Sequence, residues 1–314
     1  MFESLRQTGF CGEIEAEAAL APLTTWRIGG PAELLASPAD EDDLARALAW
    51  ADGEGVPWRV LGNGSNLLVS DQGVRGLVLR IRRVLDQLEF DGTTARAGAG
   101  LSFPALANAC ASRGLAGLEF AGGIPGTVGG AVIMNAGWHE HEFGNRVTEV
   151  RWLDAGGTVH SFNRKECRFG YRTSRFRSDR GVVVAATIQL EEGESGRIRS
   201  QTDMFVDSRK TNQPTHLPSC GSVFLKPPGD FAGRLIDACG LKGRRVGDIQ
   251  VSPMHANFFV NLGRGSADNV LELVAEVERQ VRDQFGVDLV REFEYWGGEE
   301  PSVRGDQVPD LLDE

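Results

Sequence analysis

Glycine is the feature that most constrains what this chain can fold into. It supplies 40 of the 314 residues, about 13% against a usual ~7%, and shows no collagen-like three-residue period. The glycines gather instead in a few short segments, with eight of them in residues 114–137. A residue without a Cβ lets the backbone turn sharply or lie close to another group. We therefore expect these segments to form tight turns or ligand-facing surfaces.

The rest of the composition is that of an ordinary globular chain. Hydrophobic residues make up 41% and charged residues 25%, which excludes wholesale disorder, coiled coil and collagen. The longest aliphatic stretches, such as 181–186, are far shorter than the ~20 residues that a membrane helix needs. The first residues lack the basic head and apolar run of a secretory signal. We therefore expect a cytoplasmic protein without membrane insertion.

The charge is acidic and unevenly distributed. Acids outnumber bases 44 to 33, a net charge of −11, which argues against a nucleic-acid binder. Residues 299–314 carry six acids and one arginine, and we expect 298–314 to be a disordered acidic tail. Residues 164–180 instead hold seven bases and two acids. Charge alone leaves open whether this basic stretch binds an anionic small molecule or is a solvated surface.

The cysteines and histidines do not predict a disulfide framework or a metal site. Five cysteines are widely spread without a CxxC pair, so neither disulfides nor zinc are expected. His139 and His141 could offer two ligands, but no third ligand is spaced nearby. We therefore expect no metal.

Hydrophobic patterning predicts three mixed helix-and-strand segments, 1–81, 82–207 and 208–297, with no internal repeat. In 1–81 we expect a helix after Asp40 and strands at 58–61, 67–70 and 76–81. In 82–207 we expect a helix from Ser102 to Gly114 and strands at 147–153, 158–162 and 182–190. In 208–297 we expect helices near 231–239 and at 266–285, and a strand at 257–261.

Two glycine-rich runs are candidate ligand loops. The first, Gly62-Asn63-Gly64-Ser65-Asn66, lies between two strand-like runs, so it is neither a Rossmann fingerprint nor a P-loop. It can form an anion-binding nest of N–H groups, or a plain hairpin. The second, 122–130, has five glycines in nine residues and suits neither an ordinary helix nor an ordinary strand. It predicts a backbone surface for a flat ring or a pyrophosphate, or else a mobile loop.

Three later segments carry polar groups suited to chemistry. Tyr171 and Arg172 lie in the basic stretch, and an arginine fork can hold a carboxylate in bidentate geometry. The turn-rich segment 218–227 offers two serines, Lys226 and Cys220, a nucleophile only if His216 or His255 acts as its base. A strand-like run places Glu292 and Glu294 on one face, where an exposed charge pair is the alternative.

Taken together, these segments resemble the UDP-N-acetylenolpyruvoylglucosamine reductase (MurB) family of bacterial cell-wall synthesis. The resemblance spans nearly the whole chain to about residue 297, in the family's order. It rests on TTWRIGGPAELL (24–35), LGNGSNLLVSD (61–71), GLEFAGGIPGTVGGAVIMNAG (117–137), GYRTSRF (170–176), PSCGSVFLKPPGDFAGRLID (218–237) and LKGRRVGDIQVSPMHANFFVN (241–261). The short interval from Arg172 to Ser222 resembles the subtype without the extra tyrosine-bearing substrate loop.

The resemblance implies an α+β flavoenzyme. Its two-domain flavin fold is that of the PCMH and vanillyl-alcohol-oxidase-like proteins, with non-covalent FAD held by 1–81 and 82–207, and 208–297 is an α/β substrate domain whose last strand returns to the FAD domains. NADPH reduces the flavin, which then reduces the enolpyruvyl group of a UDP-sugar to a lactyl ether in peptidoglycan precursor synthesis. The resemblance also implies a monomer or weak oligomer.

The resemblance implies catalytic roles for Arg172, Ser222 and Glu292. Arg172 and Glu292 would stabilise the enolate that hydride transfer creates, and Ser222 would give it a proton. Ser219 and Cys220 are rival donors on the same turn. The implied FAD contacts are Arg27, Gly62, Asn63, Gly64, Ser65, Asn66, Gly122, Gly123, Ile124, Pro125, Gly126, Thr127, Gly129, Gly130, Asn135, Ala136, Gly137 and Arg172. The implied substrate contacts are Tyr171, Arg209 or Lys210, Lys226, Lys242 and His255.

Two other functions remain open at this point. One is another FAD-linked oxidoreductase of the same fold, such as an oxidase of a sugar or alcohol, which needs a base and often holds FAD covalently. The other is a non-catalytic flavin- or nucleotide-sugar-binding module.

Overall fold

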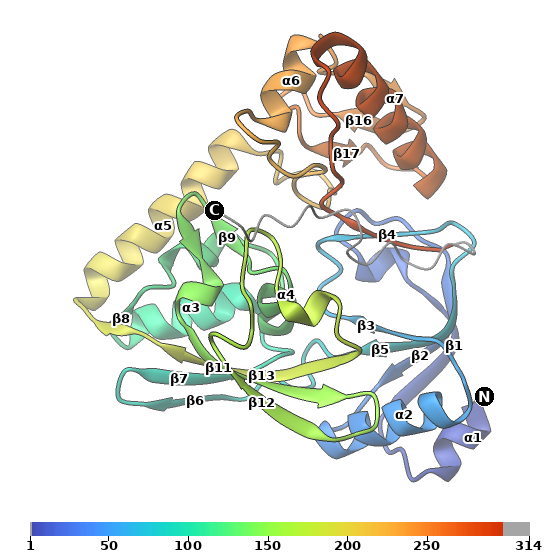
Figure 1. The fold of residues 1–314 in the computed structure, drawn as a ribbon, viewed down its shortest axis with the longest axis vertical. Coiled ribbons are helices and arrows are strands. Elements are labelled where there is room, and N and C mark those ends of the chain that lie inside the picture. Colours follow the sequence, from blue (N-terminus) through green and yellow to red (C-terminus); the bar gives the residue numbers. More distant parts are fainter. Residues whose placement is uncertain (1, 298–314) are drawn as a thin grey trace. The chain divides into compact units, whose positions relative to one another are not determined.

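The computed structural model describes residues 2–297 and divides the chain into two compact units. The first contains Glu33–Asn63, Arg75–Asp207 and the N-terminal residues up to Ala18. The second contains Ala19–Ala32, Gly64–Val74 and the chain from Ser208 onward. The predicted acidic tail, 298–314, lies outside the described residues. Figure 1 shows the elements of both units.

The first unit contains a four-stranded sheet in the order β1-β2-β5-β3. Its predicted helix begins where expected, because the Asp40 side chain caps it by accepting from the Asp43 N–H. Leu44, Ala47 and Leu48 bury its apolar face completely. The elements are α1 (Phe2–Gln7), β1 (Glu13–Ala19), β2 (Pro31–Ser37), α2 (Glu41–Gly53), β3 (Trp58–Leu61) and β5 (Val74–Arg80).

The same unit has a five-stranded antiparallel sheet in the order β12-β11-β13-β7-β6. In Figure 1 the helices α3 and α4 lie over one of its faces. The larger elements are β6 (Leu88–Asp91), β7 (Thr94–Gly98), α3 (Phe103–Ser112), α4 (Val128–Ile133), β11 (Val147–Asp154), β12 (Val159–Asn163) and β13 (Gly181–Gln189). The short ones are β8 (Leu115–Ala116), η2 (Glu119–Gly123), β9 (Gly137–Trp138), β10 (His141–Glu142), η3 (Phe143–Asn145), η4 (Arg175–Arg177) and β14 (Glu191–Glu192).

One apolar core joins the two sheets of the first unit. Leu153, Val182 and Val184 of the five-stranded sheet pack into the same cluster as Leu44 and Leu48 of α2. This shared core explains why residues of the predicted segments 1–81 and 82–207 fall into one compact unit. The three-segment domain division therefore stays a prediction.

The second unit is built around α7 (Ala267–Phe285). Ser266 and Asn269 form a capping box at its start, and Gly286 ends it in the left-handed conformation. The predicted apolar stripe is confirmed, with Val270, Leu273 and Val274 fully buried. The other elements are η1 (Ala21–Leu23), β4 (Leu67–Val69), α6 (Ala232–Ala238), β15 (Arg245–Val246), β16 (Ile249–Val251), β17 (Phe259–Asn261) and β18 (Glu294–Trp296).

The last described strand pairs with an early one. β18 lies parallel to β4, with Tyr295 opposite Leu68. The strand predicted around Glu292 therefore begins two residues late: Glu292 precedes β18, and Glu294 is exposed while Glu292 is half-buried. Of the two residues, only Glu294 lies within the strand.

Two sequence expectations are incomplete or wrong. The helix α5 (Ser195–Asn212) was not predicted, because only Ile198 and Thr202 of it are buried and it has no long apolar stripe. The expectation that 122–130 contains no ordinary helix is wrong in its second half, since α4 begins at Val128. Gly129 is tolerated there because the chain packs closely on Ala99: an added Cβ would lie 3.0 Å from the Ala99 Cβ. Within residues 2–297 no helix combines the length and apolarity required to cross a membrane.

We predict that the buried Asp43 carboxylate is a main support of the first unit. It accepts N–H groups of Cys11, Gly12 and Ala39 at 2.7 to 2.9 Å. Burial opposes ionisation, but these donors outweigh it and lower the pKa of Asp43 below its usual 3.8. Asp43→Asn should lower the free energy of unfolding by about 3 kcal/mol near neutral pH, because each charge-assisted hydrogen bond is worth ~1.5–3 kcal/mol.

The measurement is urea unfolding of both chains at several pH values, with exposed Asp42→Asn as the control. A lowered folded pKa gives stability that is complete above the unfolded pKa of 3.8 and is lost as the pH falls below it. The difference between wild type and Asp43→Asn should therefore shrink in acid. An equal difference at all pH values would contradict the role of the charge.

Candidate active site

The two predicted ligand loops meet in the first unit. A Cβ added at Gly62 would lie 2.7 Å from the Thr127 hydroxyl oxygen. That hydroxyl caps α4 by accepting the Gly130 N–H at 3.3 Å. Only glycine fits against the capping hydroxyl at this distance. The first glycine-rich loop therefore packs directly against the N-terminus of α4, which lies in the second glycine-rich loop.

The start of α4 presents free backbone donors. Val128 and Gly129 donate their N–H groups to Leu101 and Ala99. Among residues 2–297, by contrast, the N–H groups of Gly126 and Thr127 have no protein acceptor. Buried or half-buried N–H groups are nearly always paired. These two groups, bordered by glycines, therefore fit an anionic or carbonyl-bearing ligand such as a dinucleotide cofactor.

The predicted catalytic Arg172 lies on a tight turn in the same unit. Gly170 and Thr173 exchange backbone hydrogen bonds of 3.0 and 3.2 Å around it. Arg172 itself has a φ of +55°, which disfavours side chains other than those of Asn and Asp. Its guanidinium donates to the Gly137 carbonyl at 2.9 Å and lies 5.2 Å from the ring centre of Tyr171. Tyr171 is 43% exposed, so this turn presents both side chains at a surface.

Asn135 connects the cofactor loop to that turn. It follows α4 and is fully buried, and its side chain contacts Glu142, Gly144 and Gly170. Both amide hydrogens and the amide oxygen of Asn135 are therefore used in hydrogen bonds within the protein. Ser174, which sequence reasoning passed over, also fixes the turn by donating to the Ile133 carbonyl at 2.9 Å.

Ser222 and Glu292 come together in the second unit. Gly221 has a φ of +88°, which turns the chain so that Ser222 pairs with Phe258. The Glu292 N–H donates to the Val223 carbonyl at 2.8 Å. The backbone therefore places these two predicted catalytic residues on adjacent segments.

Two asparagines hold these segments in place. The Asn66 amide donates to the Glu292 carbonyl at 3.1 Å, so the Asn66 end of the first glycine loop supports Glu292. Asn257, another residue not predicted, pairs with both backbone groups of Phe224 at 3.0 and 2.8 Å. It lies in the motif HANFFVN, and a polar residue before a buried strand was the available signal.

Cys220 is unsuited to nucleophilic catalysis. Burial, and then the negative charge of Glu292, raise the pKa of Cys220 well above its usual value. A thiol kept protonated is a weak nucleophile. Its proposed base His216 is exposed. Its burial and its raised pKa therefore favour the serines of this turn over the cysteine.

His255 and Lys242, two of the predicted substrate contacts, lie in the second unit. The His255 Nδ1 accepts the Asn257 N–H at 3.2 Å, so the neutral ring carries its proton on Nε2. Burial, and also the charge of Lys242, lower the pKa of His255, which keeps the ring a neutral donor. Lys242 bonds Asp237 at 2.7 Å.

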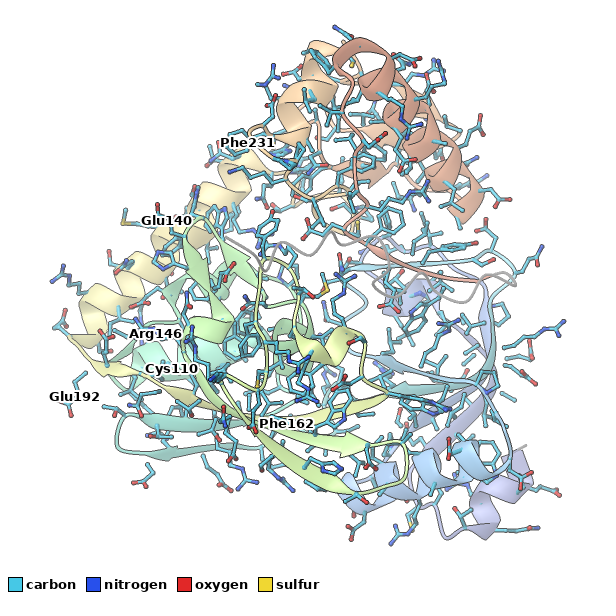
Figure 2. The ribbon with its side chains drawn as sticks, viewed as in Figure 1. Cys110, Glu140, Arg146, Phe162, Glu192 and Phe231 are labelled. Atoms are coloured by element: carbon cyan, nitrogen blue, oxygen red, sulfur yellow. The ribbon has the colours of Figure 1, made fainter. Side chains whose placement is uncertain are left out.

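The other predicted substrate cations are on the same unit. The Lys226 ammonium lies 4.6 Å from the ring centre of Phe231, which is 61% exposed. Figure 2 labels Phe231, the residue that precedes α6. Arg209 and Lys210 lie in the last turn of α5, and Arg209 bonds Gln213 at 3.0 Å. The predicted FAD contact Arg27 has a φ of +58° and lies two residues after Thr25, whose N–H donates to the Gly64 carbonyl at 3.0 Å.

The predicted site residues divide between the two units. Arg172 with Tyr171 belongs to the first unit, and Ser222 with Glu292 to the second. Of the predicted FAD contacts, Gly62, Asn63 and those from Gly122 to Gly137 fall in the first unit, and Arg27, Gly64, Ser65 and Asn66 in the second. The convergence of all of them on one site stays a prediction.

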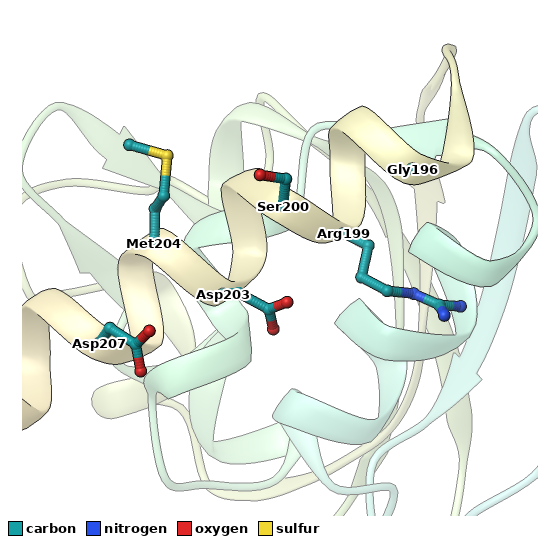
Figure 3. A pocket seen from close by; sticks show the side chains of 6 residues that line it. All are labelled: Gly196, Arg199, Ser200, Asp203, Met204 and Asp207. Atoms are coloured by element: carbon teal, nitrogen blue, oxygen red, sulfur yellow. The ribbon is translucent and has the colours of Figure 1, made fainter.

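A hollow of about 560 Å³ lies elsewhere, on α5. Figure 3 shows that one helix supplies all of its lining: Gly196, Arg199, Ser200, Asp203, Met204 and Asp207. It includes none of the predicted site residues. Among residues 2–297, no group of three His, Cys, Asp or Glu side chains is arranged to hold a metal ion.

Comparison with models of protein families identifies the class of protein to which this chain belongs. Residues 32–163 match the model of an FAD binding domain, which covers Gly62 and the loop around Thr127. Residues 213–296 match the C-terminal domain of UDP-N-acetylenolpyruvoylglucosamine reductase. The chain is thus an FAD-binding protein of the predicted fold class, with a reductase-type C-terminal domain.

Individual relatives agree over nearly the full length. UDP-N-acetylenolpyruvoylglucosamine reductase of Moorella thermoacetica is 44% identical, over 93% of this chain and 96% of that protein. The same-named protein of Rubrobacter xylanophilus is 47% identical, over 85% and 89%. The crystal structure of the reductase (MurB) from Thermus caldophilus superposes with a TM-score of 0.77 at 38% identity, covering 92% of this chain and all of that one. This chain belongs to the UDP-N-acetylenolpyruvoylglucosamine reductase family.

We predict that Gly62→Ala weakens FAD binding at least about tenfold, because the new Cβ displaces the Thr127 hydroxyl from the helix start and loss of a cap is worth ~1 kcal/mol by itself. Titration of the apoprotein with FAD, followed by flavin fluorescence, measures this. Gly53→Ala is the matched control, since a Cβ there meets nothing within 4 Å. Equal FAD affinity of both variants would contradict the assignment.

Proposed function

We propose that this protein is a UDP-N-acetylenolpyruvoylglucosamine reductase, reducing the enolpyruvyl group of its UDP-sugar to UDP-N-acetylmuramate with electrons from NADPH. The observation that carries this is the match to the Thermus caldophilus reductase over all of that chain, at 38% identity. Such coverage includes both the FAD binding domain and the reductase C-terminal domain.

The residues of the first unit fit FAD. The unpaired N–H groups of Gly126 and Thr127, and the glycine contact at Gly62, provide donors and a close backbone approach. We expect these groups and the neighbouring glycines to hold FAD without a covalent bond. When bound, FAD supplies hydride chemistry to the active site, with NADPH as the source.

Arg172 and Glu292 stabilise developing charge on the substrate. Hydride addition to an enolpyruvyl ether moves negative charge onto the adjacent carbon and its carboxylate. The Arg172 fork binds that carboxylate in bidentate geometry. Glu292, in its protonated or hydrogen-bonding form, adds a second interaction to the enolate. Both interactions are stronger after hydride transfer than before it, which is what lowers the barrier.

Ser222 donates the proton that completes the reduction. An alcohol is a weak acid in water, but an enolate carbon is a strong base, and a nearby cation favours the alkoxide. Gly221 turns the chain so that Ser222 pairs with Phe258, and the next residue, Val223, accepts the Glu292 N–H. The position next to Glu292 supports Ser222 over Ser219 for this role.

The substrate's diphosphate and sugar bind to cations of the second unit. We propose Lys226, Lys242, neutral His255 and either Arg209 or Lys210 for these contacts, with Tyr171 added from the first unit. They explain how an acidic protein binds anionic ligands. We also propose that the protein is cytoplasmic, acts as a monomer or weak oligomer, and binds no nucleic acid.

We predict that Ser222→Ala retains reduction of the flavin by NADPH and loses reoxidation by the enolpyruvyl sugar, by about 10²–10⁴-fold, the usual contribution of a general acid. Stopped-flow absorbance of the flavin separates the two half-reactions. Ser219→Ala is the control on the same turn and should keep both rates. If Ser222→Ala slows both half-reactions equally, its role is structural.

A flavin spectrum of the purified protein tests the broader assignment. Anaerobic NADPH should bleach the flavin, and the enolpyruvyl sugar should restore its colour. After denaturation the colour should separate from the polypeptide, because the proposed FAD is non-covalent. Flavin retained on the denatured chain would favour an oxidase of the same fold, and a chain that NADPH cannot reduce would favour a binding module.

A further inference from the structure

Asn135 makes an unusually complete set of polar contacts. It is fully buried. Its Nδ2 donates to the Gly170 carbonyl and to a Glu142 carboxylate oxygen, both at 2.9 Å. Its Oδ1 accepts the Gly144 N–H at 2.8 Å. An asparagine amide has two N–H donors, so both are used within the protein.

The turn that carries Arg172 depends on one of these contacts. The Gly170 carbonyl receives the Asn135 amide as well as the Thr173 N–H, which closes the turn at 3.2 Å. Arg172 sits inside this turn with a φ of +55°. Such a conformation persists in a non-glycine residue only where the surroundings hold it.

The same segment also holds the guanidinium. Arg172 Nη2 donates to the carbonyl of Gly137, two residues beyond Asn135. The far side of the turn is tied by Ser174, whose hydroxyl donates to Ile133, the last residue of α4. Hydrogen bonds to residues at or just after the end of α4 therefore hold both the turn that carries Arg172 and its guanidinium.

We propose that Asn135 is a positioning residue for Arg172, rather than a ligand of the cofactor. Its amide fixes the Gly170–Thr173 turn so that the guanidinium is preset to receive the substrate's carboxylate. Glu142 assists, because its carboxylate accepts the second amide hydrogen and orients the side chain. This inference rests on the proposed function for the role of Arg172, but the clamp on the turn is a property of the first unit alone.

Asn135→Asp tests the clamp without changing the side chain's size. It keeps an acceptor for the Gly144 N–H but turns an oxygen toward the Gly170 carbonyl and the Glu142 carboxylate. Reoxidation of the reduced flavin by the enolpyruvyl sugar should slow about 10²-fold, as for a 1 Å displacement of a catalytic group. Flavin reduction by NADPH should stay within about twofold.

A double-mutant cycle separates positioning from general destabilisation. In an Arg172→Ala chain, Asn135→Asp should slow reoxidation by less than about threefold further, because the residue it positions is gone. An equal factor in both backgrounds overturns the proposal. Asn108→Asp, on the exposed face of α3, is the matched control and should leave both half-reactions within about twofold.

Hydrogen exchange supplies a readout that does not depend on activity. The peptide containing Gly170–Thr173 should exchange faster in the Asn135→Asp holoenzyme, while peptides of α3 should not change. Adding Glu142→Gln should partly restore protection, because the new amide can donate to the carboxylate. Unchanged exchange in this peptide overturns the proposal. If the unsubstituted chain does not turn over the enolpyruvyl sugar, the proposed function is wrong. The hydrogen-exchange measurement still tests whether Asn135 holds the Gly170–Thr173 turn, because it does not depend on activity.

Ser174→Ala covers the case in which Asn135→Asp does not fold. It removes a single hydrogen bond from the other end of the same turn. Reoxidation should slow about tenfold when Arg172 is present and stay nearly constant when it is absent. A loss that is the same in both chains contradicts a positioning role for this clamp.

Discussion

The contact between Gly62 and the Thr127 hydroxyl is the constraint on which the candidate cofactor surface depends. At 2.7 Å from the place of a Cβ, the hydroxyl leaves room for glycine only. The same hydroxyl caps α4, so the loop, the helix start and the unpaired N–H groups of Gly126 and Thr127 are fixed together. The N–H groups of Val128 and Gly129, which donate to Leu101 and Ala99, hold the second loop as well, so its donors are fixed by several contacts.

The second unit positions its chemistry differently, through backbone pairing between distant segments. Ser222 lies opposite Phe258, and Glu292 is bonded to the residue after Ser222. Asn257 and Asn66 complete the arrangement by bonding to main-chain groups. Side chains that bond to backbone in this way replace ladder hydrogen bonds where regular strands end. The result is that the backbones of Ser222 and Glu292 are fixed by several segments rather than by one element.

Much of the fold was predictable because its signals are local. Asp40 as a helix cap, the α7 stripe and the β3 strand each follow from residues within one element. The helix α5 was not predicted from the sequence, because so few of its residues are buried. For the site, motifs identified the segments but not the contacts within them: the Asn135 amide bonds to Glu142, Gly144 and Gly170. Those partners are up to 35 positions away, and no local pattern encodes which polar group a buried amide will meet.

The conformation of Arg172 shows how stability and function oppose each other in this turn. A left-handed φ in a non-glycine residue costs about 1 kcal/mol or more, and glycine at the same position would avoid that cost. The chain nevertheless places an arginine there and offsets the strain with the hydrogen bonds of Gly170, Thr173 and Asn135. A turn that needed only to close would favour Gly or Asn at this position. An arginine at this position agrees with the role that we propose for its guanidinium, and the surrounding hydrogen bonds hold its backbone in place.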